Sequence, residues 1–269
     1  MRELRGKTAV ITGAGSGIGR SLSLAFAGEG MNIVLADIEL ANAEAVAAEV
    51  RAKGVQAVPV RCDVSDRESV AALAARATEA FGGVHLLCNN AGVVPFATIQ
   101  DTTPANWDWT LAVNVNGVFN GVSAFLPALR AAGEAHIVNT ASIAGLYGMP
   151  GLAAYVASKF AVVGLSEAMR YDLAPLGIGV SVLCPGGVRT NIAASTEHRP
   201  ERFGGPVAVP VEYRTAAAGA SSMEPDDVAA LVVRAVKENQ LYVPTHPDTR
   251  PQAAARAGLV AAGYDWLGG

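Results

Sequence analysis

The sequence predicts an α/β fold in which one doubly wound parallel sheet is covered by helices on both faces. Short apolar runs alternate with longer amphipathic stretches along most of the chain, as in repeated βαβ units. A glycine-rich turn directly follows the first apolar run. With 269 residues, 51% of them hydrophobic, the chain can bury a core without disulfides or metals. We therefore expect a single Rossmann-type domain over residues 1–269, with about seven parallel strands.

The strands are expected where apolar runs are too short for helices. Ser65 is a suitable N-cap for one helix, since Glu68 follows three residues later. Pro127 is expected to kink another helix or to end it early. The predicted strands cover 7–12, 32–36, 56–61, 85–89, 135–140, 179–183 and 241–243. The predicted helices cover 18–28, 41–53, 66–81, 105–131, 152–173 and 225–237, and an alanine-rich tail follows at 252–262.

The stretch 190–223 breaks this pattern. It contains several prolines and glycines and shows no sustained periodicity. Long irregular segments inside a compact domain are usually functional. We expect this one to be a substrate-binding lid.

Charge and cysteine usage exclude several classes of function. The net charge is −4 and no lysine or arginine cluster occurs, so neither nucleic acid nor an anionic membrane is an expected partner. The charge-free run 135–158 holds a histidine, an asparagine and several glycines, and the N-terminus is charged, so no membrane span or export signal is predicted. A small-molecule substrate is therefore expected. Cys62, Cys88 and Cys184 lie far apart, which predicts no disulfide, no metal site and a cytoplasmic protein.

The glycine-rich turn is a candidate phosphate-binding loop. Gly13, Gly17 and Gly19 have G-x-x-x-G-x-G spacing, with Ser16 and Ile18 between them, rather than the strict G-x-G-x-x-G pattern. Such glycines let the backbone approach a pyrophosphate at a helix N-terminus. A plain tight turn is the alternative, but the position between the first strand and first helix favours a nucleotide.

An acidic residue ends the second predicted strand. Asp37, about twenty residues past the loop, is placed to accept hydrogen bonds from an adenosine ribose and to repel a 2′-phosphate. No lysine or arginine occurs at positions 14–18 or 38–40, so NAD is predicted over NADP. Asp63 and Val64, which follow the third strand, are expected to contact the adenine edge. A solvated carboxylate at a strand end is the alternative reading of Asp37.

Tyr155 and Lys159 form a candidate catalytic pair. They are four residues apart on a predicted helix and so share a face. A nearby ammonium group favours the phenolate, so Lys159 is expected to lower the pKa of Tyr155. Ser142, which follows the fifth strand, would place a hydroxyl at the same point. The alternative for Tyr155 is an ordinary tyrosine at the edge of the core.

Taken together, these motifs resemble the short-chain dehydrogenase/reductase family over about residues 6–245. The order and spacing match in every motif that was found. They are TGAGSGIG at 12–19, Asp37, Asp63-Val64, Asn89-Asn90-Ala91-Gly92, Asn114, Ser142, Tyr155-x-x-x-Lys159 and Pro185-Gly186-Gly187-Val188-Arg189-Thr190.

The resemblance implies a role for each matching residue. Tyr155 would be the general acid/base, Ser142 would polarise the substrate oxygen, and Lys159 would bind the nicotinamide ribose. Asn114 would hold a water that links the site to solvent. Asn116 is the competing asparagine, but two residues turn a helix by about 200°, so only one can face the site, and family spacing selects Asn114. The implied contacts to NAD also include Asn90, Ala91, Gly92, Pro185, Gly186, Val188 and Thr190.

The expected substrate is a hydrophobic or aromatic secondary alcohol or ketone, because the predicted pocket wall is mainly apolar. Arg189, Arg199 and Arg202 leave open a carboxylate in the substrate. Short stretches at 191–193, 198–200 and 238–242 resemble the Cα-dehydrogenase branch that acts on lignin-derived aryl alcohols. A 3-oxoacyl reductase and a catalytically silent cofactor-binding protein are the alternatives. The predicted wall comprises Val94, Phe96, Ser142, Ile143, Tyr147, Met149, Tyr155, Gly187 and Asn191.

Self-association is the last expectation. The predicted helices 105–131 and 152–173 carry apolar residues on more than one face. In the family such helices pair across a two-fold axis. A homotetramer is therefore expected, with a dimer as the alternative.

Overall fold

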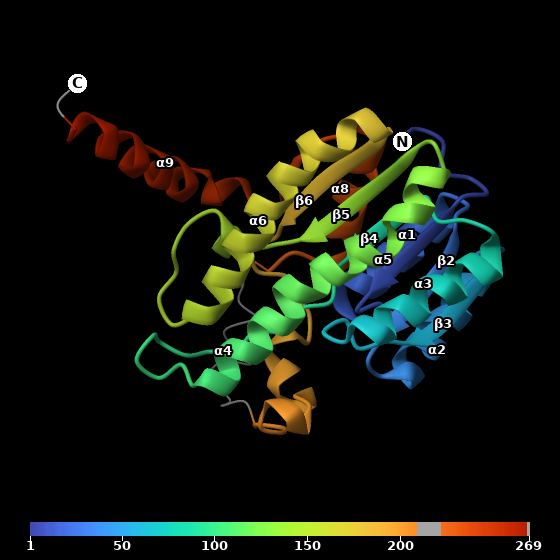
Figure 1. Cartoon of the computed structure of the whole chain (residues 1–269), viewed down its shortest axis with the longest axis horizontal. Coiled ribbons are helices and arrows are strands. Elements are labelled where there is room, and N and C mark those ends of the chain that lie inside the picture. Colours follow the sequence, from blue (N-terminus) through green and yellow to red (C-terminus); the bar gives the residue numbers. More distant parts are fainter. Residues whose placement is uncertain (209–221, 268–269) are drawn as a thin grey trace.

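Seven strands form one parallel sheet in the order β3-β2-β1-β4-β5-β6-β7 in the computed structural model, which describes residues 1–208 and 222–267 (Figure 1). This confirms the predicted fold. The order reverses direction between β1 and β4, and in such sheets ligands bind beyond the carboxyl ends of the strands at that point. The strands are β1 (Thr8–Thr12), β2 (Asn32–Asp37), β3 (Ala57–Arg61), β4 (Leu86–Asn89), β5 (Ala135–Thr140), β6 (Ile178–Cys184) and β7 (Tyr242–Pro244).

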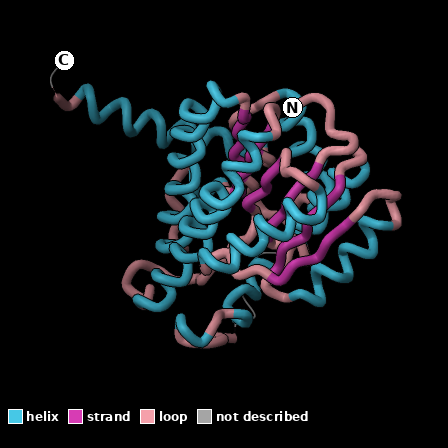
Figure 2. Tube along the Cα trace, turned by 45° about the vertical axis from the view of Figure 1, so that its right-hand side comes forward, coloured by secondary structure: helices cyan, strands magenta, loops and turns pink. Residues whose placement is uncertain are grey.

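Helices cover both faces of the sheet (Figure 2). On one face, α1 (Gly17–Gly28), α2 (Leu40–Arg51) and α8 (Pro225–Glu238) share a core with the strands. On the other face, the core contains residues of α3 (Arg67–Phe81), α5 (Gly117–Ala131) and α6 (Ala153–Leu173). Neighbouring residues of β1 point to opposite faces, since Ile11 belongs to the first core and Val10 to the second. Burial on both faces explains why the strands read as continuous apolar runs.

The helix after β3 begins one residue later than expected. Asp66, not Ser65, is its N-cap, and the Asp66 side chain accepts a hydrogen bond from the backbone N–H of Glu68. The Ser65 hydroxyl instead donates to Oδ1 of Asp63 at 2.6 Å. The prediction was wrong because the short Asp63 side chain competes for that hydroxyl.

The predicted helix 105–131 is longer and less regular than expected. Its first part, α4 (Pro104–Leu111), is capped by Thr103, and a π turn at Ala112–Asn116 joins it to α5. Pro127 lies inside α5 and does not end it. Phe125 and Leu129, on either side of the proline, are fully buried, and their packing holds the helix in place despite the lost hydrogen bond.

Two helices have apolar side chains that the sheet covers only in part or not at all. The helix Pro104–Ala131 is long and apolar enough to cross a membrane by length and composition alone, and part of its apolar surface is buried where α5 packs against α3 and β4. The alanine-rich tail is a helix, α9 (Arg250–Asp265), that has no buried residue. It projects away from the sheet and helices (Figure 1). Leu259 and Tyr264 of this helix and Trp266 directly after it are exposed.

Candidate active site

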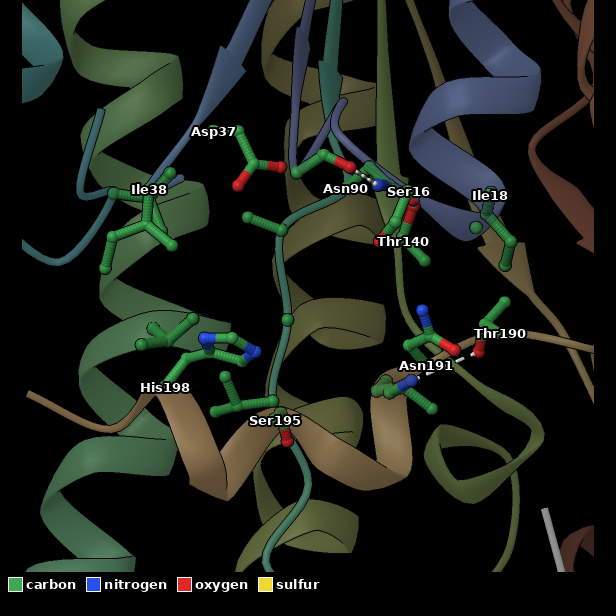
Figure 3. Close-up of a pocket in the computed structure, with 18 of the residues that line it drawn as sticks. Ser16, Ile18, Asp37, Ile38, Asn90, Thr140, Thr190, Asn191, Ser195 and His198 are labelled. Atoms are coloured by element: carbon green, nitrogen blue, oxygen red, sulfur yellow. Dashed lines mark hydrogen bonds between the residues drawn. The ribbon is translucent and has the colours of Figure 1, made fainter. Parts of the chain in front are cut away.

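A cleft of about 420 Å³ lies at the carboxyl ends of the strands, where the strand order reverses. This volume is within the range of small-molecule sites. Its walls come from the loops after β1, β2, β3, β4, β5 and β6 and from α6. Figure 3 shows these distant segments converging around Asp37, Asn90 and Thr190.

The glycine-rich loop forms one end of the cleft. Gly13 and Gly17 have φ of +63° and +48°, in the left-handed region that favours glycine. A Cβ on Gly19 would lie 1.9 Å from the carbonyl oxygen of Gly13, so the turn closes only without a side chain. Ser16 precedes α1 with an extended backbone, and its side chain forms no hydrogen bond to cap that helix. The N-terminus of α1 therefore offers N–H groups and a favourable dipole for an anion.

Asp37 is held in a fixed orientation at the end of β2. Its Oδ2 accepts the backbone N–H of Gly15 at 2.8 Å, and its Oδ1 accepts that of Glu39 at 3.0 Å. The carboxylate lines the cleft (Figure 3). It is placed to accept further hydrogen bonds from a polar ligand.

The Asn90-Ala91-Gly92 turn is fastened to β1. The hydroxyl of Thr12 accepts the backbone N–H groups of Asn90 and Ala91 at 2.9 and 3.1 Å. The Asn90 amide donates to the carbonyl of Thr12 at 3.0 Å. This turn therefore keeps the floor of the cleft in place beside the glycine-rich loop.

Ser142, Tyr155 and Lys159 all line the cleft. The Lys159 ammonium donates to the carbonyl of Thr140 at 2.8 Å and lies 5.4 Å from the centre of the Tyr155 ring. The Ser142 hydroxyl accepts the N–H of Ala144 at 3.1 Å. The three side chains thus come from the end of β5 and from one face of α6.

The expected lowering of the Tyr155 pKa by Lys159 is wrong in this structure. Burial raises the pKa of Tyr155 to about 12, and the hydrogen bond with Ser142 offsets this only in part. Burial also lowers the pKa of Lys159 to about 8, with Cys184 acting weakly in the other direction. Both groups have lost water, and desolvation is the largest cause of both shifts.

Asn114 lies behind the cleft wall instead of in it. Its Oδ1 accepts the N–H of Val93 at 2.8 Å, and its Nδ2 donates to the Val93 carbonyl at 2.9 Å and to the Ser158 hydroxyl at 3.0 Å. Asn114 is buried, whereas Asn116 is exposed. The side chain of Asn114 therefore ties the π turn to α6 and to the loop after β4.

The cleft gathers most of the predicted cofactor residues but few of the predicted substrate residues. All of the cofactor set except Gly19 line it. Of the substrate set, Ser142, Tyr155 and Asn191 line it, whereas Val94 is buried nearby and Gly187 is exposed. Phe96, Ile143, Tyr147 and Met149 are partly buried outside its lining. The part of the predicted lid at 209–221 lies outside the described residues.

Several lining residues were not predicted from the sequence. Some of them follow β2 and one belongs to α4, and only their position next to predicted residues could have indicated them. They include Ile38, Glu39, Asn42 and Trp109. Ser195, His198 and Pro200, which also line the cleft, belong to the segment 190–223 that was expected to be a lid.

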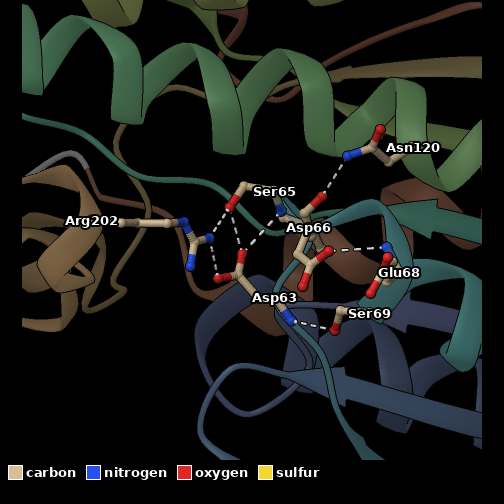
Figure 4. Close-up of polar contacts among 8 residues, drawn as sticks. Asp63, Ser65, Asp66, Glu68, Ser69, Asn120 and Arg202 are labelled. Carbon is tan, nitrogen blue, oxygen red and sulfur yellow. Dashed lines mark hydrogen bonds and ion pairs between the residues drawn. The ribbon is translucent and has the colours of Figure 1, made fainter.

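The three loop arginines each have a partner within the chain. Arg189 pairs with Glu224. Arg199 is buried, and its Nε donates to the carbonyl of Gly205 at 2.7 Å. Arg202 pairs with Asp63 at 2.6 Å (Figure 4). These contacts weaken the case for an acidic substrate.

Comparison with known proteins gives consistent results. Residues 7–201 match the family model for short chain dehydrogenases. A C alpha-dehydrogenase from Sphingobium sp. strain SYK-6 is 35% identical over 255 residues, which cover 93% of this chain and 84% of the relative.

Two solved structures extend this similarity to the whole fold. A short-chain dehydrogenase/reductase from Burkholderia phymatum in complex with NAD superposes with a TM-score of 0.91 at 39% identity, over 98% of this chain and 97% of that one. The apo form of LigD from Sphingobium sp. strain SYK-6 superposes with a TM-score of 0.82 at 30% identity, over 96% of this chain and 97% of LigD.

Proposed function

The chain belongs to the short-chain dehydrogenase/reductase family, close to its Cα-dehydrogenases, and from this premise we propose that it interconverts a hydrophobic aromatic secondary alcohol and its ketone with NAD. The observation that carries the proposal is the meeting of Ser142, Tyr155 and Lys159 with the glycine-rich loop in one cleft. Function is argued from this site, because the fold alone hosts many activities.

The residues present fit a dinucleotide. The glycine-rich loop and the N-terminus of α1 line the cleft through Gly13, Ser16 and Gly17, and the loop turns tightly because Gly19 has no Cβ to meet the Gly13 carbonyl. Asp37 would hold the adenosine ribose, and Lys159 the ribose at the other end. The nicotinamide group, when bound, supplies a hydride acceptor for the alcohol or a hydride donor for the ketone.

Side chains of this protein transfer the proton to and from the substrate oxygen. In ketone reduction, the neutral Tyr155 phenol donates its proton to the carbonyl oxygen, while the Ser142 hydroxyl donates a hydrogen bond to the same oxygen. In alcohol oxidation, the Tyr155 phenolate accepts the alcohol proton. Because burial raises the pKa of Tyr155, oxidation should accelerate as the pH rises. Asn114 supports the cleft wall by accepting the N–H of Val93. We also propose that it holds a water through which the site exchanges protons with solvent.

Preference for NAD over NADP is supported by Asp37. A 2′-phosphate placed near this fixed carboxylate would be repelled, and its two anchoring N–H groups keep it from turning away. The substrate class is supported by the occupied loop arginines and by the name of the relative from Sphingobium.

The deciding experiment is a spectrophotometric panel with both NAD and NADP. It compares 1-aryl alcohols and aryl ketones with aliphatic secondary alcohols of equal size and with a 3-oxoacyl thioester. The highest kcat/KM is expected for an aryl substrate with NAD. A preference for the thioester would identify a 3-oxoacyl reductase, and binding of NADH without any turnover would identify a silent cofactor-binding protein.

We further propose a cytoplasmic homotetramer, in which residues 1–269 act as one domain. The three buried free cysteines support the compartment. The exposed apolar residues Phe119 of α5, Tyr171 of α6 and Trp266 after α9 support association. Light scattering at micromolar concentration tests this proposal, and a stable monomer would contradict it.

A further inference from the structure

One short segment after β6 crosses the cleft from one wall to the other. Residues 192–203, here called the cap segment, contain two 3-10 helices, Ile192–His198 and Glu201–Phe203. Ser195, His198 and Pro200 of this segment line the same cleft as Ile38 and Asp63. Figure 3 shows Ser195 and His198 on the opposite side of the cleft from Asp37. The cap segment is therefore part of the wall around the proposed adenosine end.

One side of the cap segment is firmly attached. Arg199 is only 7% exposed, its Nε donates to the carbonyl of Gly205 at 2.7 Å, and its guanidinium lies 6.0 Å from the centre of the Trp109 ring in α4. The Ser195 hydroxyl accepts the backbone N–H of Val94 at 3.0 Å. These contacts hold the segment to α4 and to the loop after β4.

On the other side, Arg202 attaches the cap segment to the loop after β3, and Nδ1 of His198 lies 3.9 Å from Oε1 of Glu39 after β2. Nη2 of Arg202 donates to Oδ2 of Asp63 at 2.6 Å and to the Ser65 hydroxyl at 2.7 Å (Figure 4). Oδ1 of Asp63 is held by the N–H of Ser65 at 3.0 Å and by its hydroxyl at 2.6 Å. Burial raises the pKa of Asp63, but the hydrogen bonds from Ser65 and Arg202 outweigh it and leave that pKa below its ordinary value. The carboxylate therefore stays ionised at neutral pH and keeps its attraction for Arg202.

We propose that Arg202 is a positioning residue that fastens the cap segment across the adenosine end of the cleft, so that the cofactor dissociates only when the Arg202–Asp63 contact opens. The proposal rests on the proposed function, because it assumes that the adenosine half of NAD lies beside Asp37 and Asp63. It goes beyond that function, because Arg202, which does not line the cleft, would set the rate at which the cofactor dissociates.

If Arg202 had a purely structural role, its loss would lower folding stability and not specifically change cofactor dissociation. The side chain is 51% exposed, and ion pairs of this kind contribute little to folding stability. Loss of Arg202 should thus leave unfolding unchanged, whereas the cap segment would lose its attachment to the loop after β3. The effect on cofactor dissociation is then separable from stability.

The test compares Arg202→Met and Arg202→Lys with Arg76→Met, which removes an ion pair of similar arginine exposure on α3. NADH dissociation is followed by stopped-flow fluorescence. Binding of ADP and of nicotinamide mononucleotide, probes for the two halves of the cofactor, is followed by calorimetry.

We expect Arg202→Met to raise the NADH dissociation rate by about three- to tenfold and to weaken ADP binding by a similar factor. Binding of the mononucleotide and the unfolding midpoint should not change. Arg202→Lys should be intermediate, because a point charge replaces a planar donor. Arg76→Met should match wild type.

Two kinds of failure can be told apart. Unchanged NADH dissociation and ADP affinity in Arg202→Met would overturn the role of Arg202, as would an equal loss in Arg76→Met or a weaker affinity for the mononucleotide alone. Wild-type protein that bound ADP but turned over no alcohol or ketone would contradict the proposed function, while the ADP comparison would still decide the role of Arg202.

Discussion

Replacing Lys159 by methionine should stabilise the protein at neutral pH. Lys159 is only 2% exposed, and its ammonium donates to one carbonyl, that of Thr140. Among the described residues, no carboxylate forms an ion pair with it. Methionine keeps the apolar stem and removes the charge that burial penalises.

The size of the effect follows from the pKa of Lys159, which burial lowers from its ordinary value of 10.5 to about 8. Below pH 8 the folded and unfolded states are both protonated, and the folded state carries the full desolvation cost of about 3 kcal/mol. Between pH 8 and 10.5 the folded state loses its proton first, so wild-type stability rises with pH. The lost hydrogen bond to Thr140 offsets about 1 kcal/mol. The variant should be more stable by about 2 kcal/mol at pH 7 and by roughly zero at pH 10.

Urea unfolding at pH 7, 8, 9 and 10 measures this difference. Titration of Tyr155, whose pKa burial raises to about 12, affects both proteins and cancels in the comparison. Lys53→Met, at an exposed position, serves as the control and should show no such trend. A stability difference that stayed constant from pH 7 to 10 would refute the reasoning.

Three further outcomes are expected. Tyr155→Phe should lower kcat by about 10²- to 10⁴-fold while calorimetry shows nearly unchanged NADH affinity, and near wild-type kcat would rule out its acid/base role. Asp37→Ala should reduce the ratio of kcat/KM for NAD over NADP, which we expect to exceed about tenfold in wild type; equal use of both by wild type would contradict this. Gly19→Ala should weaken NADH binding at least about tenfold and destabilise the fold by about 1–3 kcal/mol, because the new Cβ overlaps the Gly13 carbonyl. Gly28→Ala, at the open end of the same helix, should do neither.

The strands, the glycine-rich loop and the Tyr155–Lys159 pair could be predicted because each depends on residues that are close together in the sequence. Strands such as β1 are buried on both faces, so their apolar runs are visible in the sequence. The glycine-rich loop was recognisable because its backbone, with Gly13 in the left-handed region, tolerates few other residues. Tyr155 and Lys159 were recognisable because helical spacing places them on one face.

Properties that depend on the assembled environment were not predictable. The direction of the Tyr155 pKa shift depends on how much water the cleft wall removes, and that wall comes from several loops. Arg202 and Asp63 are 139 positions apart, and the segment that carries Arg202 has no periodicity. The partners of loop arginines therefore had to come from the structure.

The π turn at Ala112–Asn116 makes chain length a constraint in this part of the core. A single residue in excess of α-helical spacing separates α4 from α5, and each helix buries a large side chain, Trp109 in the first and Phe125 in the second. Because the π turn already absorbs one extra residue, deletion of one residue within it would restore a regular helix and keep the buried faces of α4 and α5 in register. Insertion of a further residue would instead rotate α5 by about 100° relative to α4 and move either Phe125 out of the core or Trp109 out of the cleft wall. An insertion between these two aromatic residues should therefore be far more damaging than a deletion within the π turn.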